Sequence, residues 1–145
     1  MVRRTKGREL AVQVLYSFHN NTKSIDEIFD DDMFDKVADF NREYATIITK
    51  GIVANKEMLE DIISKYSKNW KIKRIALIDK IILLIAIYEM KFMPEIPHPV
   101  AIDEAIVLSK KFSDTESGKF INGILDAVNK NEKFDTHKKN DGWIK

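Results

Sequence analysis

The sequence predicts an all-α protein, and three observations support this. Apolar residues recur at intervals of three and four along most of the chain, the period of a helix that buries one face. No convincing run alternates apolar and polar residues with the period of two that is typical of a strand. Glycines number only five in 145 residues, and all three prolines lie in one segment, "PEIPHP", residues 94–99. Together these features favour a bundle of helices.

Three helical segments are predicted in the first half of the chain. In each of them the apolar residues fall on one face, with helical spacing. The stripes are Ala11, Val14, Leu15 and Phe18; Val37, Phe40, Tyr44, Ile47, Ile48 and Gly51; and Met58, Leu59, Ile62 and Ile63. A lysine-rich stretch around Trp70 follows them. We therefore expect the chain to divide near residue 68.

The second half begins with "RIALIDKIILLIAIYEM", residues 74–90, which is apolar nearly all round. Such a segment predicts a central helix that is contacted from several sides. Two more helices are expected after the prolines, with Ser113 and Glu116 at the spacing of a capping box before the last one. Their inward stripes are Ile102, Ala105, Ile106 and Leu108, and Phe120, Ile121, Ile124, Leu125 and Val128. We expect one domain, 1–135, with subdomains of about 1–68 and 69–135, and a flexible polar tail, 136–145.

Composition argues against several kinds of chemistry. The chain has no cysteine, which excludes disulfides, thiolate metal sites and a cysteine nucleophile. Its three histidines (His19, His98, His137) lie far apart, and none has the metal-ligand spacing of a motif such as H-E-x-x-H. We therefore expect no enzyme active site, no metal and no cofactor. The longest apolar run, Ile81–Ile87, is far shorter than the roughly 20 residues that span a bilayer, and with no signal-peptide pattern the cytoplasm is expected.

Charge is unevenly distributed, although the formal net charge is only +1. Residues 1–8 carry four bases and no acid, namely Arg3, Arg4, Lys6 and Arg8. On a helical wheel Arg8 and Tyr16 share one flank of the first helix, about 12 Å apart. A cation and an aromatic ring on one exposed edge can hold a phosphate and an unstacked base of single-stranded RNA. The alternative is a solubilising N-terminal arm, with Tyr16 closing the edge of the core.

The last predicted helix offers a second surface. Lys119, Asn122, Gly123 and Asp126 lie opposite its apolar stripe. An exposed glycine inside a helix costs about 1 kcal/mol relative to alanine. One explanation is the close approach of a ribose or another backbone, with Asn122 and Lys119 supplying hydrogen bonds. A closely crossing neighbouring helix, or simple tolerance of the glycine, explains it equally well.

Five segments together resemble the NusB family of bacterial transcription antitermination factors. They are "RELAVQVLYS", "TKGIVANKEML", "IDKIILLIAIYEM", "IPHPVAIDEAIVLSKKFS" and "SGKFINGILDAV", in the same order over residues 3 to about 129. The resemblance implies a three-helix N-terminal subdomain packed on a four-helix C-terminal one. It implies binding to boxA, a short U-rich single-stranded element of ribosomal RNA leaders, together with NusE, a small-subunit ribosomal protein. It also implies entry into an antitermination complex on RNA polymerase, which promotes rRNA transcription and maturation.

The same resemblance assigns roles to individual residues. The bases at the N-terminus become a phosphate-contacting arm, and Asp79, with the adjacent Lys80, is assigned to the protein partner. The full set of expected RNA-binding residues, to which the exposed face of the last helix adds Asn122, is Arg3, Arg4, Lys6, Arg8, Tyr16, Tyr66, Glu116, Ser117, Lys119, Phe120 and Asn122. The family pattern "ILR" reads "ILL" here, so that Leu84 stands in place of an arginine and one possible cationic contact is lost.

A protein-only adaptor is the alternative function. Asp79, Lys80, Leu83 and Ile87 share one side of the predicted central helix. If that side is open to solvent, an apolar patch flanked by charges would dock a partner helix or strand. If the other helices cover Leu83 and Ile87, the patch does not exist. The oligomeric state, a homodimer included, stays open.

Overall fold

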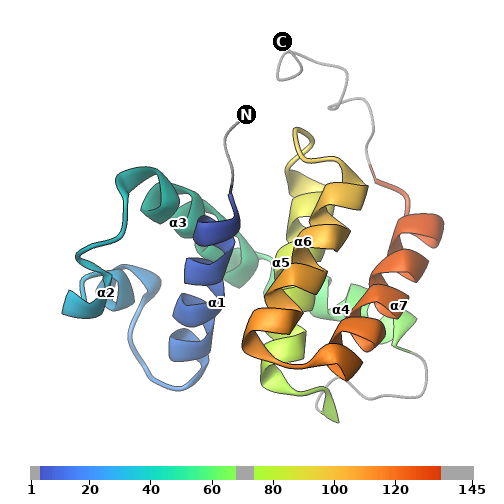
Figure 1. Ribbon diagram of the computed structural model, residues 1–145, viewed down its shortest axis with the longest axis horizontal. Helices are drawn as coiled ribbons and strands as arrows, with labels where there is room; N and C mark the ends of the chain where they lie inside the picture. Colours follow the sequence, from blue (N-terminus) through green and yellow to red (C-terminus); the bar gives the residue numbers. More distant parts are fainter. Residues whose placement is uncertain (1–3, 68–73, 135–145) are drawn as a thin grey trace.

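The computed structural model describes residues 4–67 and 74–134, and in these ranges the chain is helical, without a strand (Figure 1). The elements are α1 (Thr5–His19), α2 (Ile25–Phe29), the 3-10 turn η1 (Asp32–Phe34), α3 (Asp39–Ala54), α4 (Lys56–Tyr66), α5 (Leu77–Phe92), α6 (His98–Phe112) and α7 (Thr115–Asn131). The all-α prediction is confirmed. No helix in the described ranges is both long enough and apolar enough to cross a bilayer.

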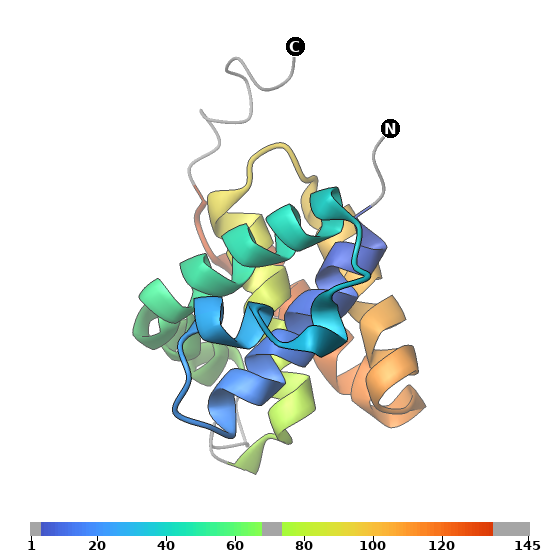
Figure 2. The same ribbon diagram turned by 90° about the vertical axis from the view of Figure 1, so that its left-hand side faces the viewer.

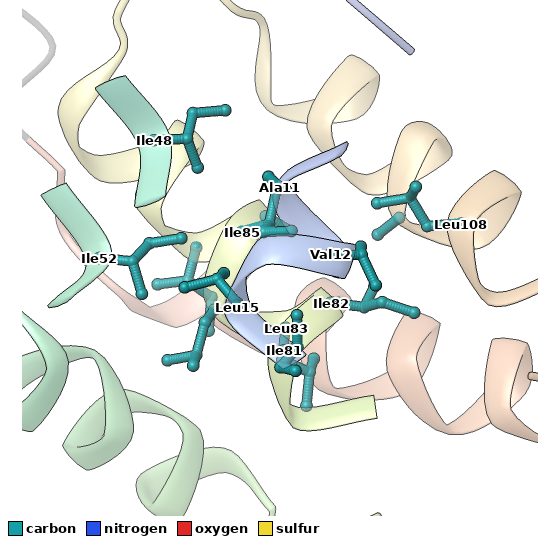
Figure 3. Close-up of a cluster of buried hydrophobic side chains, with 14 of the residues drawn as sticks. Ala11, Val12, Leu15, Ile48, Ile52, Ile81, Ile82, Leu83, Ile85 and Leu108 are labelled. Carbon is teal, nitrogen blue, oxygen red and sulfur yellow. The ribbon is translucent and has the colours of Figure 1, made fainter. Parts of the chain in front are cut away.

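Helix α5 forms the centre of the core. Every residue from Ile81 to Ile87 is buried, because α1, α3, α4, α6 and α7 all pack on this helix. Figure 3 shows its isoleucines and leucines among side chains of α1, α3 and α6. The prediction of a central helix is therefore confirmed. Leu83 and Ile87 are fully buried, so the open apolar patch that a protein-only adaptor requires is absent, and that expectation is wrong.

The packing divides the helices into α1–α3 and α4–α7. Helix α4 makes its main contacts with α5 and α7 rather than with α3. Lys80 of α5 pairs with Glu60 of α4 at 3.2 Å, and the hydroxyl of Tyr66 donates to Glu132 at the end of α7. The boundary therefore falls near Asn55 and not near residue 68, because α4 belongs with the helices that follow it. The resulting groups of three and four helices agree with the arrangement that the resemblance implies.

Helix α3 buries a different face from the predicted one. Tyr44 and Ile48 are buried as expected, but Phe40 and Ile47 are 48% and 49% exposed. The buried stripe is instead Tyr44, Ala45, Ile48, Thr49 and Ile52. The helix is rotated because α1 and α5 both contact it, and together they cover the face centred between Tyr44 and Ile52.

The start of α7 also differs from its prediction. The N-cap is Asp114, whose carboxylate accepts the backbone N–H of Ser117 at 2.8 Å. The capping box predicted for Ser113 and Glu116 is therefore wrong. A capping box does occur at the start of α2, where the side chains of Ser24 and Glu27 each accept the other residue's backbone N–H. The same sequence spacing thus serves as a cap at one helix and not at the other.

Candidate RNA-binding surface

The basic residues at the N-terminus do not form a single exposed arm. Arg3 lies outside the described residues. Lys6 projects into solvent from the first turn of α1. The guanidinium of Arg4 lies over the ring of Tyr44, 4.5 Å from its centroid, and 3.7 Å from a carboxylate oxygen of Glu95. Arg4 is therefore held against α3 and the α5–α6 loop while remaining partly exposed.

Arg8 lies inside the protein, and its predicted contact with phosphate is wrong. Its Nε donates to Glu89 Oε2 at 2.7 Å, and its Nη1 donates to Glu104 Oε1 at 2.9 Å. The hydroxyl of Tyr44 donates to the same Glu89 oxygen, and that of Thr5 donates to Glu104 at 2.6 Å. This network joins α1 to α3, α5 and α6. A guanidinium enclosed in this way has no surface left for an RNA strand.

The network holds an acid that would be costly to bury alone. Burial raises the pKa of Glu89, and the positive charge of Arg8 and its hydrogen bond oppose that rise. Burial also raises the pKa of Tyr44, and the negative charge of Glu89 adds to the effect. Glu89 Oε1 has no hydrogen-bond partner among the described residues. Arg8 is therefore the main compensation for the buried carboxylate.

Two exposed lysines come together where α1 passes the end of α6. Lys111 Nζ lies 3.0 Å from Glu9 Oε1, and Lys6 Nζ lies 3.7 Å from the same oxygen. Two cations that share one acid leave a net positive charge at this point. Sequence reasoning missed Lys111. The signal was the segment "SKKF", which places two lysines in the last turn of α6. Lysines at this end of a helix also complement the helix dipole, so the segment alone does not indicate a binding site.

Tyr16 borders a groove further along α1. Tyr16 is 47% exposed, so the predicted exposure is confirmed, and the residue lies about 15 Å from Lys6 along the helix. The groove has a volume of about 630 Å³ and runs between α1, the η1 turn and the α5 and α6 ends. It is mainly apolar, with amides and hydroxyls at its edge, and is lined by Val12, Gln13, Tyr16, Ser17, Asn20, Asn21, Met33, Phe34, Ile78 and Phe112.

Asp79 lies beneath the start of α7. The Ser117 hydroxyl donates to Asp79 Oδ2 at 3.1 Å and itself accepts from Ser113 at 2.7 Å. Burial raises the pKa of Asp79, the hydrogen bond from Ser117 opposes the rise, and the negative charge of Asp114 adds to it. The assignment of Asp79 to direct contact with a partner does not fit this burial. Its carboxylate is turned inward and positions Ser117.

Lys80 and Leu84 are also turned toward neighbouring helices. Lys80 is mostly covered and pairs with Glu60. Leu84 is buried and lines a cavity of about 180 Å³ between α1, α3, α4 and α5. The position at which the resemblance expects an arginine is therefore not part of the exposed surface beside Tyr16.

The first turns of α7 present a polar face. Glu116, Lys119 and Asn122 are exposed, and Lys119 Nζ lies 3.4 Å from a Glu116 oxygen. Phe120 is half-buried against the core. Apart from the adjoining backbone of α7, no atom of the described residues lies within 4 Å of the point where a Cβ of Gly123 would stand. A crossing helix therefore does not explain this glycine, and two readings remain: an open approach to the backbone and simple tolerance of the glycine.

Tyr66 is not part of this surface. Its hydroxyl bonds Glu132 at the C-terminal end of α7, whereas Ser117 lies in the first turn. The distance from Ser117 to Glu132 along the helix is about 22 Å. The structure thus brings Asp79, Ser117 and the Tyr16 groove to one end of the helices, and it places Tyr66 at the other.

Comparisons with known proteins agree with this architecture. The model of the NusB family matches residues 5–130. The transcription antitermination protein NusB of Bacillus cereus (strain ATCC 10987 / NRS 248) is 41% identical over 128 residues, which are 88% of this chain and 97% of the relative. A related NusB from Bacillus thuringiensis (strain Al Hakam) is equally similar, at 41% over the same length.

Solved structures give the same result. A crystal form of T. maritima NusB superposes with a TM-score of 0.75 at 32% identity, covering 96% of this chain and 98% of that one. A crystal structure of antitermination factors NusB and NusE in complex with dsRNA superposes with a TM-score of 0.78 at 26% identity. The match covers 88% of this chain and 96% of that one. These relatives are antitermination factors and not enzymes. The chain belongs to the NusB family.

Proposed function

We propose that this antitermination factor acts in the cytoplasm and binds single-stranded boxA RNA of ribosomal RNA leader transcripts together with NusE. Membership of the NusB family supports the proposal. So does the structural neighbour that is described as NusB and NusE in complex with dsRNA. Bound to both partners, the protein would join the antitermination complex on RNA polymerase and promote rRNA transcription and maturation.

The observation that carries the RNA proposal is the half-exposed ring of Tyr16 on the same helix as Lys6. Lys6 and Lys111 supply positive charge at one end of the surface, and the ring borders an apolar groove beyond them. Lysines neutralise phosphates whatever the sequence, and a free aromatic ring stacks on an unpaired base. A single strand fits this combination better than a duplex, in which the bases are already stacked.

The start of α7 would extend the same surface. Ser117, Lys119 and Asn122 offer hydroxyl, ammonium and amide groups in the first turns of α7, the helix that follows Phe112 of the groove in the chain. Glu116 would repel phosphate and so lower the affinity. Tyr66 would take part only if the strand continued to the far end of α7. In this account Arg4 and Lys6, not Arg8, form the described part of the basic arm.

Fluorescence anisotropy with a labelled boxA strand tests the proposal. The protein is titrated into boxA RNA and into a scrambled strand of the same composition, with and without purified NusE. We expect tighter binding to boxA than to the scrambled strand, and a further gain with NusE for boxA alone. Equal binding to both strands under all conditions would contradict the proposal, and so would a protein that binds NusE but binds neither RNA strand.

A further inference from the structure

A cavity lies at the junction of the two groups of helices. It has a volume of about 180 Å³ and is bounded by α1 and α3 from one group and by α4 and α5 from the other. In Figure 2, α3 runs across the molecule and leads into α4 at its left-hand end. The lining residues are Leu15, Phe18, His19, Ile52, Val53, Lys56, Leu77, Lys80, Ile81 and Leu84. Such junctions between packed units are where small-molecule sites preferentially occur.

Most of the cavity wall is apolar. Its most deeply buried members come from three helices and are Leu15, Ile52, Ile81 and Leu84. The volume is close to the roughly 150 Å³ of an engineered apolar cavity that binds benzene. The space therefore suits a single ring or a short branched chain, and it is too small for a drug-sized ligand.

The ionisable groups of the lining are all basic. His19 and Lys56 are exposed and mark the mouth of the cavity, whereas the side chain of Lys80 is only 17% exposed. Among the lining residues that the structure describes there is no acid. Glu60 pairs with both lysines, its Oε2 lying 3.2 Å from Lys80 Nζ and 4.0 Å from Lys56 Nζ. Two ammonium groups that share one carboxylate leave a positive charge beside the cavity.

The lysines also keep free hydrogen-bonding capacity. An ammonium group carries three donors. Within the described part of the chain, Glu60 Oε2 is buried and has no hydrogen-bond partner, so Lys80 meets it only as an ion pair. Lys56 is the first residue of α4, and Asn55 provides no side-chain cap there, so the positive end of the helix dipole adds to the charge of the lysines. An anionic oxygen at the mouth would therefore be well stabilised.

We propose that this cavity binds a small organic carboxylate whose apolar part is about the size of one ring. The apolar part lies among Leu15, Ile52 and Leu84, and the carboxylate lies at the mouth and accepts from Lys56 and Lys80. An inorganic anion would leave the apolar space unfilled. A neutral apolar molecule would leave the positive charge without a partner, so neither matches the cavity as well as a molecule that has both parts.

The site is separate from the candidate RNA-binding surface. Leu15 and Phe18 line the cavity, whereas Val12 and Tyr16 line the groove, so the two open on different flanks of α1. No lining residue is shared between them. Failure of the RNA proposal would therefore leave this inference standing, and its own test requires no RNA.

An NMR titration of the ¹⁵N-labelled full chain with sodium benzoate tests the inference. We expect saturable shifts of the backbone amide signals of the residues that line the cavity. Benzyl alcohol has the ring without the charge and should bind about tenfold more weakly or worse. Acetate and inorganic phosphate, at the same concentration and ionic strength, should not produce these shifts, because neither fills the apolar space.

Variants separate the contributions of charge and space. Lys56→Met removes one ammonium group and should weaken benzoate binding by about tenfold. Lys50→Met is the matched control, because the Lys50 side chain is also 50% exposed but pairs with Asp26, and it should leave the affinity unchanged. Leu84→Phe fills the cavity and should abolish binding. If that variant loses its helical circular-dichroism spectrum, Val53→Phe fills the cavity from a half-buried position instead.

Four results would overturn the proposal. The first is the absence of saturable shifts with benzoate, or shifts confined to residues away from the cavity. The second is binding of benzyl alcohol or phosphate as tight as that of benzoate. The third is equal weakening by Lys50→Met and Lys56→Met, because general charge would then be responsible. The fourth is a folded cavity-filling variant that binds benzoate as the wild type does.

Discussion

The Nε atom of Arg8 lies 2.7 Å from a carboxylate oxygen of Glu89, and both side chains are almost completely removed from water. This contact joins α1 to α5 across 81 residues of sequence. The helix that carries Lys6 and Tyr16 is thus fastened to the core by a buried ion pair. Arg8 acts on the candidate RNA-binding surface by fixing α1, not by touching the strand.

Replacing Arg8 with methionine should destabilise the fold strongly. The substitution leaves the Glu89 carboxylate buried without its main partner, which costs about 3–5 kcal/mol of unfolding free energy. The double variant Arg8→Met/Glu89→Met removes both charges. It should lose clearly less unfolding free energy than Arg8→Met alone. Urea unfolding at neutral pH measures both. Lys6→Met, at an exposed position nearby, should stay within about 0.5 kcal/mol of the wild type. A double variant no more stable than Arg8→Met alone would show that the charges are not coupled.

Asp79→Asn should stabilise the protein in a pH-dependent manner. The pKa of Asp79 is raised in the fold, so the neutral form is favoured there. The contribution of Asp79 to the free energy of unfolding is therefore present at low pH. It is lost as the pH rises through the pKa that Asp79 has in the folded state. Asparagine avoids that loss, and its side-chain oxygen can still accept the hydrogen bond from the Ser117 hydroxyl. We therefore expect the free energy of unfolding to rise by about 1 kcal/mol at pH 7. Urea unfolding at pH 7 and below about pH 4 checks this. A gain of equal size at both values would contradict the proposed cause.

Lys6→Ala/Lys111→Ala should weaken boxA binding through charge. On a single strand the log–log slope of affinity against salt is about −0.7 per phosphate neutralised. Loss of two phosphate contacts should therefore make the slope shallower by about 1.4. Lys130→Ala is the control, because Lys130 is exposed at the opposite end of α7, where it pairs with Asp126. Equal effects from both variants would indicate general charge and not this surface.

Tyr16→Ala should weaken boxA binding without changing the salt slope. A base stacked on an aromatic ring contributes about 1–3 kcal/mol, and that interaction neutralises no phosphate. Tyr16→Phe keeps the ring and should retain most of the affinity. Anisotropy titrations at several salt concentrations separate the two effects. If Tyr16→Ala binds as tightly as the wild type, the ring does not receive a base.

The helices could be predicted from periodicity, because burial of one face leaves a regular pattern in the sequence. The central position of α5 follows from its apolar residues on all sides. The rotation of α3 could not be predicted in this way. Phe40 and Ile47 are apolar and correctly spaced, but contacts with α1 and α5 decide which face is covered. The assignment of α4 to the second half depends on the same kind of distant contact.

The candidate site was less predictable than the fold. Tyr16 could be proposed because its spacing places it on a flank of the apolar stripe of α1 and because the family resemblance assigns an aromatic residue to this position. Arg8 was misplaced because its partners, Glu89 and Glu104, are 81 and 96 residues away. Glu89 lies at the end of an apolar run that gives no sign of a buried charge pair. Lys111 was missed because only the fold brings the end of α6 beside α1.

Photocrosslinking tests the path of the RNA most directly. A boxA strand carrying 5-iodouridine is irradiated in complex with the protein and NusE, and the attached residues are identified by mass spectrometry. We expect crosslinks at Tyr16 and in peptides from the end of α6 and the start of α7, with a scrambled strand giving far fewer. Crosslinks confined to Tyr66 or to α3 would contradict the account, because the strand would then lie on a different face.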